Sequence, residues 1–387
     1  MRLGQIPIAQ RERTEAMKIT CDREKLAAAF HTAAAVAPAR SPKPILQSVK
    51  LDVAGGAAVI TATDLEIGIR VEVPGIQVEQ DGSAVLPINR FSPVLKESSD
   101  ATLSLEADEK GIVVRGQRSE FRFPAANPNE FPAVAAFEAE QYHDVSARLL
   151  RELIRRTAFA TDNESSRYAL GGVLFEFEAD KITAVGTDGR RLAKMEGPAA
   201  AVGGHPTSEQ MTIIPTRAMT LIERSLSDAD AEVQLAARPN DVLIQGPRVT
   251  IYSRLVEGRF PKWRDVFPQR QQAIQIEMVV GPFHSAVRQA AIATSEESRG
   301  IDFTFGEGKL LLAGSAAEVG QSRVELPIEY GGAPVSIMLD PRFVADFLRV
   351  LDPDKNITFE LADAESAAVC TTDDGYGYVI MPLARDR

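Results

Sequence analysis

The sequence predicts an α+β fold made of three tandem copies of one domain, each with two helices and about eight strands. Three observations predict this fold. A short turn motif recurs about every 125 residues, at Thr63-Asp64, Thr187-Asp188 and Gly314-Ser315. Each copy of the motif follows a predicted β-hairpin. The surrounding elements recur in one order, which is helix, hairpin and strands, helix, three strands. Recurrence at the length of a domain indicates repeated domains.

Composition is that of a globular protein and excludes several other classes. The chain has 387 residues, of which 44% are hydrophobic and 25% charged, enough for two or three domains with ample cores. No apolar run is long enough to span a bilayer, and residues 1–16 lack the apolar region of a signal peptide. We therefore expect a cytoplasmic protein with a disordered extension over residues 1–16. Cys21 and Cys370 lie far apart and are expected to be reduced thiols.

The first domain is expected over residues 17–142. Asp22 is a good N-cap for a helix that runs to about Val36, and Gly55-Gly56 is the turn of a hairpin. A second helix begins near Pro87 and ends near Ser98. The strands expected around these helices are 17–20, 49–53, 57–61, 67–73, 102–106, 112–115 and 120–124.

The second and third domains, expected over residues 143–272 and 273–387, repeat this order. Their first helices follow Asp144 and begin near Pro282, and their second helices begin near 216 and 341. We expect Asn89, Thr216 and Asp340 to cap the three second helices. The strands are expected at 172–178, 182–187, 232–236, 241–245, 249–255, 301–305, 309–313, 356–361, 367–371 and 376–382. Two helices cannot cover both faces of eight strands, so the helices should lie on one side of each domain.

Positive charge gathers on the predicted helices although the chain carries a net charge of −11. On a helical wheel Arg148, Arg151 and Arg155 lie together, opposite the apolar side of their helix. A solvated face explains such a pattern on one helix. The same bias on all six helices favours a shared basic surface, to which Arg217, Arg288 and Arg342 also belong. Such a surface suits phosphate backbones that are bound without sequence preference.

Seven sequence motifs, in order along the chain, carry a resemblance to a known family. They lie at residues 40–46, 63–66, 167–176, 187–192, 255–261, 298–300 and 378–383; the fourth reads Thr187-Asp188-Gly189-Arg190-Arg191-Leu192. Each motif alone is weak, but seven in the same order are specific. Over residues 17 to about 383 the chain resembles the DNA polymerase III beta subunit family, the bacterial sliding clamps.

The resemblance implies a head-to-tail homodimer that closes into a ring around duplex DNA, with helices lining the hole and sheets outside. The chain would be a non-catalytic processivity factor of the DNA polymerase III holoenzyme. Its partners would be the replicative DNA polymerase, the clamp loader and other proteins with a clamp-binding motif. It implies no cofactor and no metal. Because the ring is held on DNA by topology, weak and salt-sensitive contacts would permit sliding.

For its partners, the resemblance implies a hydrophobic peptide pocket between the second and third domains. Leucine, valine and methionine would form an adaptable apolar groove, and extended backbone could hydrogen-bond the peptide. Leu170 and Val266, taken singly, also fit a domain core. Departures from the family pattern at Asp265, Ser298, Asp340 and Phe343 predict a partner motif that differs in detail. Ala169 stands where some clamps have a second aromatic, which argues against base stacking on DNA at that position. By matched position the pocket contains Leu170, Thr187, Gly189, Arg191, Leu192, Pro261, Val266, Ile380, Met381 and Pro382.

The resemblance also implies residues that contact DNA and residues at the ring seam. Arg40 and Tyr168 would join the helix arginines at DNA, although Tyr168 also fits a half-buried strand aromatic. At the seam, the strand edge near Phe121 would meet the third domain of a second copy near Ile292 and Ile301. Pairing of edge strands satisfies their backbone groups, and a head-to-tail contact that closes gives a ring.

Two other classes of protein fit the sequence less well. An enzyme is disfavoured because the sequence has no phosphate-binding loop, no dinucleotide fingerprint and no HExxH motif. Asp188 is the carboxylate that would best fit a catalytic role, but an aspartate before glycine more often caps a turn. A monomeric scaffold that only binds peptides remains a second alternative. Light scattering distinguishes it from the ring, because the scaffold would have the 41.9 kDa mass of one chain and the ring twice that mass.

Overall fold

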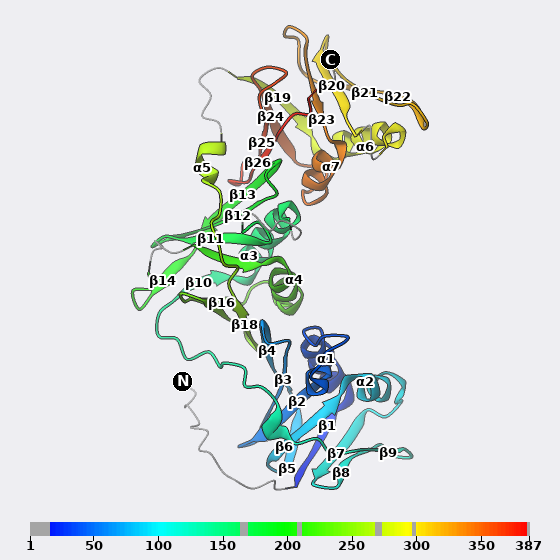
Figure 1. Ribbon diagram of the computed structural model, residues 1–387, viewed down its shortest axis with the longest axis vertical. Coiled ribbons are helices and arrows are strands. Elements are labelled where there is room, and N and C mark those ends of the chain that lie inside the picture. Colours follow the sequence, from blue (N-terminus) through cyan, green and yellow to red (C-terminus); the bar gives the residue numbers. More distant parts are fainter. Residues whose placement is uncertain (1–15, 163–168, 207–210, 268–272, 296–298, 385–387) are drawn as a thin grey trace. The chain divides into compact units, whose positions relative to one another are not determined.

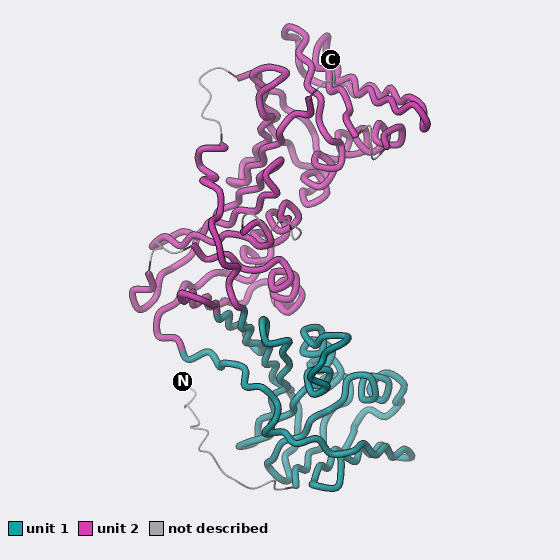
Figure 2. The backbone as a smooth tube through the Cα atoms, viewed as in Figure 1, with its two compact units in different colours: residues 1–138, 243–253 teal, residues 139–242, 254–387 magenta. Residues whose placement is uncertain are grey.

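The computed structural model describes residues 16–162, 169–206, 211–267, 273–295 and 299–384, which form two compact units (Figure 2). Unit 1 is Met1–Glu138 with Leu243–Ser253 and contains the first repeat. Unit 2 is Ala139–Val242 with Arg254–Arg387 and contains the second and third repeats. The predicted extension over residues 1–16 lies outside the described residues, except Ala16.

Unit 1 has two antiparallel sheets and two helices that pack on each other, α1 (Arg23–Ala34) and α2 (Ile88–Glu97) (Figure 1). The rings of Phe30 and Phe91 join the helices at a centroid distance of 5.1 Å. The first sheet has the order β5-β1-β7-β8-β9, with bounds Ile76–Gln80, Met17–Asp22, Thr102–Asp108, Gly111–Arg115 and Glu120–Phe123. The second runs β6-β2-β3-β4-β18, with bounds Gly82–Pro87, Ser48–Ala54, Ala57–Thr63, Ile67–Glu72 and Val249–Arg254.

Unit 2 is organised around an eight-stranded antiparallel sheet to which two repeats contribute. Its order is β15-β11-β12-β13-β26-β25-β24-β19, and the central pair β13–β26 joins the second repeat to the third. The second repeat supplies Thr212–Pro215, Gly172–Phe177, Lys181–Thr187 and Arg191–Pro198. The third supplies Gly377–Ile380, Ala368–Thr371, Asn356–Leu361 and Ile274–Val279. This continuous sheet makes the second and third repeats one unit.

Unit 2 has further strands outside the large sheet. β10 (Tyr142–Ser146) pairs with β14 (Ala200–Val202) and β16 (Glu232–Ala237). β17 spans Asp241–Gln245, of which Leu243–Gln245 belong to unit 1. A four-stranded sheet of the third repeat has the order β22-β21-β20-β23, with bounds Gly320–Pro327, Lys309–Ala316, Ile301–Gly306 and Val335–Leu339.

The helices of unit 2 pack in pairs, as those of unit 1 do. α3 (Ala147–Thr157) packs on α4 (Thr216–Ser225), and α6 (Val280–Ala290) packs on α7 (Pro341–Arg349). α7 is held by aromatic stacking, because the Phe347 ring lies parallel to Tyr378 at 4.8 Å. A short helix, α5 (Trp263–Val266), lies in the connection to the third repeat. The 3₁₀ turns are Pro44–Gln47, Pro128–Glu130, Ala158–Ala160 and Ala291–Ala293.

The predicted fold class, with three tandem repeats of paired helices and antiparallel strands, is confirmed. Asp22 and Asp340 cap α1 and α7, each accepting a backbone N–H through its carboxylate. The predicted caps at Asn89 and Thr216 are wrong, since Pro87 and Pro215 take the N-cap positions without a side-chain bond. Helix α3 is capped by Ser146, and Asp144 lies in a strand that was not predicted.

Candidate functional site

The turn between β12 and β13 is built by two side chains that bond to its own backbone. Thr187 Oγ1 donates to the carbonyl of Arg191 (2.6 Å) and accepts from Gly189 N (3.1 Å). Asp188 Oδ1 accepts from the backbone N of Arg190 (2.9 Å) and of Arg191 (3.0 Å). Gly189 has a φ of 86°, which glycine adopts without strain. The interpretation of Asp188 as a turn cap is confirmed.

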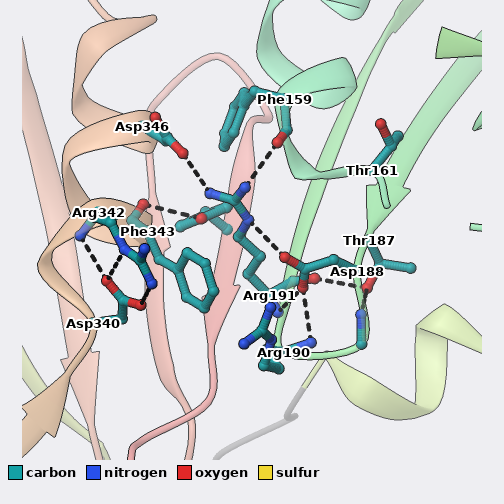
Figure 3. Close-up of polar contacts among 12 residues, drawn as sticks. Phe159, Thr161, Thr187, Asp188, Arg190, Arg191, Asp340, Arg342, Phe343 and Asp346 are labelled. Atoms are coloured by element: carbon teal, nitrogen blue, oxygen red, sulfur yellow. Dashed lines mark hydrogen bonds and ion pairs between the residues drawn. The ribbon is translucent and has the colours of Figure 1, made fainter. Parts of the chain in front are cut away.

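Arg191 fastens this turn to the third repeat (Figure 3). Its guanidinium contacts Asp188 Oδ2 (3.1 Å) and, on α7, Asp346 Oδ2 (2.7 Å). It also donates to the carbonyl of Phe159 (2.9 Å) and lies 4.4 Å from the ring centroid of Phe343. Only 10% of the Arg191 side chain is exposed. Arg191 was predicted as a pocket residue, and these contacts also make it a structural link between two repeats.

The C-terminal segment runs beside the same turn. In the β13–β26 pair, Arg191 lies opposite Ile380 and Leu192 opposite Val379. Beyond β26, Met381 N donates to the carbonyl of Arg190 (2.9 Å). The Met381 residue is 45% exposed, so it presents an apolar side chain at the surface next to the turn.

A buried apolar cluster underlies this surface. It includes Leu192 and Val379 from the paired strands, and Phe260 and Trp263 from the connection between repeats, with Val256 and Phe267 packed against it. The connection is fixed by Glu176, which accepts from Trp263 Nε1 (3.2 Å) and from both terminal nitrogens of Arg264 (2.9 and 2.7 Å). The apolar floor is therefore rigid and formed by both repeats.

The predicted pocket residues divide into a buried and an accessible set. Leu170, Thr187, Leu192 and Ile380 are buried, and of these Leu192 belongs to the apolar cluster. Pro261 and Pro382 are half-buried, while Gly189, Val266 and Met381 are exposed. Apolar side chains of both kinds are what a shallow peptide groove requires.

Beside the turn lies a polar cavity of about 540 Å³ that the sequence did not predict (Figure 3). The Arg190 guanidinium in its wall lies 5.3 Å from the Phe343 ring centroid. Arg342 also lines it, and its guanidinium pairs with Asp340 Oδ2 (2.7 Å). Arg342, which was predicted as a DNA contact, lies in this cavity beside the turn, and its contact with DNA stays a prediction. The lining residues are Thr161, Asp162, Asp188, Arg190, Arg191, Arg299, Arg342, Phe343 and Asp346.

The other predicted DNA contacts lie mostly at the surface. Arg40, Arg217 and Arg288 are exposed. Arg148 pairs with Asp230 (2.7 Å) and Arg155 with Glu152 (2.7 Å), both at exposed positions where ion pairs are weak. Arg151 is half-buried, and its Nε is buried without a hydrogen-bond partner. Tyr168 and Ser298 lie outside the described residues.

Two of the three predicted seam residues are accessible. Phe121 is 36% exposed on β9, which is an edge strand. Ile292 is 76% exposed in the 3₁₀ turn after α6. The prediction for Ile301 is wrong, because its side chain is fully buried and β20 pairs on both sides. The edges of that sheet are β22 and β23.

The described residues show neither a metal cluster nor a reactive thiol. They hold no group of three or more His, Cys, Asp or Glu side chains that could bind a metal ion. Burial raises the pKa of the Cys21 thiol to about 12 and raises that of Cys370 as well, so both thiols stay protonated and inert. Among the same residues, no helix is long and apolar enough to cross a membrane.

Comparison with known proteins accounts for each repeat in turn. The DNA polymerase III beta subunit models match as N-terminal domain over residues 17–135, central domain over 144–262 and C-terminal domain over 264–384. The beta sliding clamp of Chlamydia muridarum is 27% identical over 369 residues, covering 95% of this chain and 99% of that protein. The beta sliding clamp of Pseudomonas putida is 28% identical over 376 residues, covering 95% of this chain and all of that protein.

Solved structures agree with the sequence matches. A sliding clamp from Pseudomonas aeruginosa bound to griselimycin superposes with a TM-score of 0.88 at 26% identity, covering 96% of this chain and 100% of that one. A C. crescentus beta sliding clamp superposes with a TM-score of 0.85 at 27% identity, over 96% of this chain and 100% of that one.

These matches, together with the three repeats, define a non-catalytic clamp subunit built from tandem domains. The chain belongs to the DNA polymerase III beta subunit family, the bacterial sliding clamps.

Proposed function

We propose that two copies of the chain close head to tail into a ring around duplex DNA and tether the replicative DNA polymerase in the cytoplasm. The observation that carries this proposal is the match of all three family domains, in order, over nearly the whole chain. Processivity then comes from enclosure of the DNA. The chain acts as a sliding clamp, the processivity factor of the DNA polymerase III holoenzyme.

Ring closure joins the first repeat of one copy to the third repeat of the other. The exposed Phe121 on edge strand β9 supports this seam from one side, and the exposed Ile292 supports it from the other. Unpaired strand edges and exposed apolar side chains favour association, and a head-to-tail contact that closes gives a ring. Ile301 acts only as core beneath the seam.

DNA contacts within the ring are electrostatic and independent of sequence. Exposed helix arginines supply them, while the net charge of −11 discourages DNA from binding elsewhere on the protein. Two of these arginines, Arg148 and Arg155, already pair with carboxylates, so the hold on DNA is weak enough for sliding. The proposed contacts are Arg40, Arg148, Arg151, Arg155, Tyr168, Arg217, Arg288 and Arg342.

Partner proteins dock a short peptide on the surface over the apolar cluster of unit 2. The polymerase, the clamp loader and other proteins with a clamp-binding motif would share this surface in turn. Leu192 and Val379 form its floor, and Val266 and Met381 are exposed for contact. Apolar grooves of this kind bind extended peptides through side-chain pockets and backbone hydrogen bonds.

Release from DNA tests the proposal. Protein loaded onto nicked circular DNA by the clamp loader should stay bound, and cutting the circle once should release it. The matched control is a circle nicked again at the same site, which should retain the protein. If the protein stays on the linear DNA whose ends are free, the ring proposal is wrong.

A further inference from the structure

Arg190 is a cation of the polar cavity whose guanidinium forms no ion pair with a carboxylate among the residues that the structure describes. Its guanidinium lies over the Phe343 ring at 5.3 Å, and the residue is exposed. The neighbouring Arg191 is held between Asp188 and Asp346, and Arg342 is paired with Asp340. The cavity therefore offers the Arg190 guanidinium to a ligand from outside.

The Phe343 ring prepares Arg190 for an anionic ligand. A guanidinium stacked on an aromatic face keeps its N–H edges free for hydrogen bonds in the plane. Phe343 is itself fixed, because its carbonyl accepts from the buried Tyr378 hydroxyl (3.0 Å) and its ring also contacts Arg191. A planar fork held in this way matches a carboxylate, which accepts two parallel N–H bonds.

Arg190 is also continuous with the apolar surface. Its carbonyl accepts a hydrogen bond from Met381 N, so Met381 lies next to Arg190, and the Met381 side chain is exposed. A peptide that places an apolar side chain on Met381 brings a residue close to Arg190. This continuity favours a side chain of the docked peptide over a phosphate of DNA as the ligand.

We propose that the polar cavity receives a carboxylate side chain of the partner peptide, with Arg190 as the residue that sets a preference for acidic clamp-binding segments. The proposal rests on the peptide-binding function proposed above. The Glu or Asp side chain lies in the cavity and bonds the Arg190 guanidinium, while the apolar side chains of the peptide cover Met381 and Val266.

A peptide series tests this preference. The probe is a fluorescent clamp-binding peptide from the polymerase catalytic subunit, made with Glu or Gln at each position that flanks its apolar residues. Fluorescence anisotropy gives the dissociation constants for the full-length dimer. We expect one position at which Glu binds about two- to fivefold more tightly than Gln, as for an exposed ion pair. The preference should shrink as salt rises.

Variants at Arg190 assign the preference to this residue. Arg190→Ala should remove the preference for Glu by lowering the affinity of the Glu peptide and leaving that of the Gln peptide unchanged. Arg190→Glu should reverse the preference. The matched control is Arg224→Ala on α4, which removes an equal charge from a residue that does not line the cavity. This variant should keep the preference for Glu. Equal loss for both peptides in Arg190→Ala would mean a merely structural role and would overturn the proposal.

The outcomes also separate this inference from the function on which it rests. If both peptides bind the unaltered protein with equal affinity at every position, the carboxylate preference is wrong and the peptide pocket stands. If neither peptide binds, the proposed pocket itself is wrong. If a preference for Glu persists in Arg190→Glu, another cation recognises the carboxylate and Arg190 does not.

Discussion

Two turns of this molecule share one hydrogen-bond scheme but carry different side chains. In the first repeat, Thr63 Oγ1 donates to Ile67 O (2.8 Å) and accepts from Leu65 N (2.9 Å). Asp64 Oδ1 accepts from the backbone N of Glu66 (3.0 Å) and of Ile67 (2.7 Å). The turn Thr187–Arg191 in the second repeat makes the same four bonds at matching positions.

The difference lies in the three residues that the Thr-Asp pair holds in place. The third position is Leu65 with φ 81° in one turn and Gly189 with φ 86° in the other. The fourth is the exposed Glu66 in one and the exposed Arg190 in the other. The fifth is the buried core residue Ile67 in one and Arg191, bound to α7, in the other. The two turns therefore share their backbone scaffold and differ in the residues at these three positions.

Removing Arg191 should have the largest effect on stability. Arg191→Ala leaves Asp188 and Asp346 without their shared cation at the junction of two repeats, which should lower the free energy of unfolding of unit 2 by about 3 kcal/mol. Denaturant unfolding followed by the fluorescence of Trp263 in unit 2 measures it. Arg190→Ala, one residue away, should change it by less than about 0.5 kcal/mol. Equal effects of the two variants would contradict the division of roles.

Replacing the third residue of the second turn by that of the first should have the next largest effect on stability. Gly189→Leu copies the first turn and should destabilise the protein by about 1–2 kcal/mol, because a side chain at positive φ strains the backbone. No atom lies within 4 Å of the added Cβ, so packing adds nothing to this value. The thermal unfolding midpoint measures it, with Gly204→Leu, also at positive φ in open space, as the matched control of similar cost. A neutral Gly189→Leu would show that the turn tolerates leucine without strain.

Low pH should destabilise the second repeat, because this repeat contains a buried pair of histidines. The described parts of the first and third repeats have no such pair. His205 Nε2 accepts from Ala237 N (3.1 Å), so its Nδ1 carries the proton donated to His143 Nδ1 (2.9 Å). His143 Nε2 donates to Glu178 O (2.7 Å). Both rings must be neutral for every bond to form, and burial lowers the pKa of His205, with the nearby His143 lowering it further.

The sign of the pH effect follows from the lowered pKa. The unfolded chain binds a proton more readily than the folded one, so the contribution is complete above about pH 6.5 and is lost as the pH falls. The loss should be about 1 kcal/mol, the value of one buried hydrogen bond. The free energy of unfolding is measured between pH 7.5 and 5.5 for the unaltered protein and for His205→Gln. The variant keeps His284, whose pKa is also lowered by burial, so the difference between the two slopes reports on His205. Identical pH slopes would contradict this role.

The charge at the fourth turn position should have the smallest effect on stability. Arg190→Glu copies the first turn, and the free energy of unfolding should change by less than about 0.5 kcal/mol because the residue is exposed. The same variant should reverse the peptide preference, so stability and binding separate at one residue. A large loss of stability would place Arg190 among the structural residues instead.

Local signals in the sequence predicted the parts of the fold that depend on neighbours in the chain. Asp22 before a helical pattern predicted the start of α1, and Gly55-Gly56 between strands predicted a hairpin. Both signals worked because a cap and a tight turn are formed within a few residues. The caps at Asn89 and Thr216 failed because a proline two or one residue earlier already sets an extended backbone before the helix. Strand β13 was missed because its mixture of charged and apolar residues has no clear alternation.

The candidate site was only partly predictable for a different reason. Family-matched positions gave the apolar residues, but the polar cavity depends on contacts between distant residues. Arg191 meets Asp346, 155 positions away, and no local pattern indicates that pair. Ile301 was misplaced because the sequence does not show which strand of a sheet lies at its edge. Arg190 could have been noticed by aligning the two turns, since its counterpart is Glu66.

The most direct test of the central claim, that the chain works as a closed ring on DNA, is retention after the seam is cross-linked. Phe121→Cys and Ile292→Cys can be joined by a short bis-maleimide, because the native Cys21 and Cys370 are buried. Cross-linked protein on nicked circular DNA should survive a wash with about 1 M salt, which screens charge contacts, and should leave when the circle is cut. Loss in the wash, or retention after cutting, would contradict the claim.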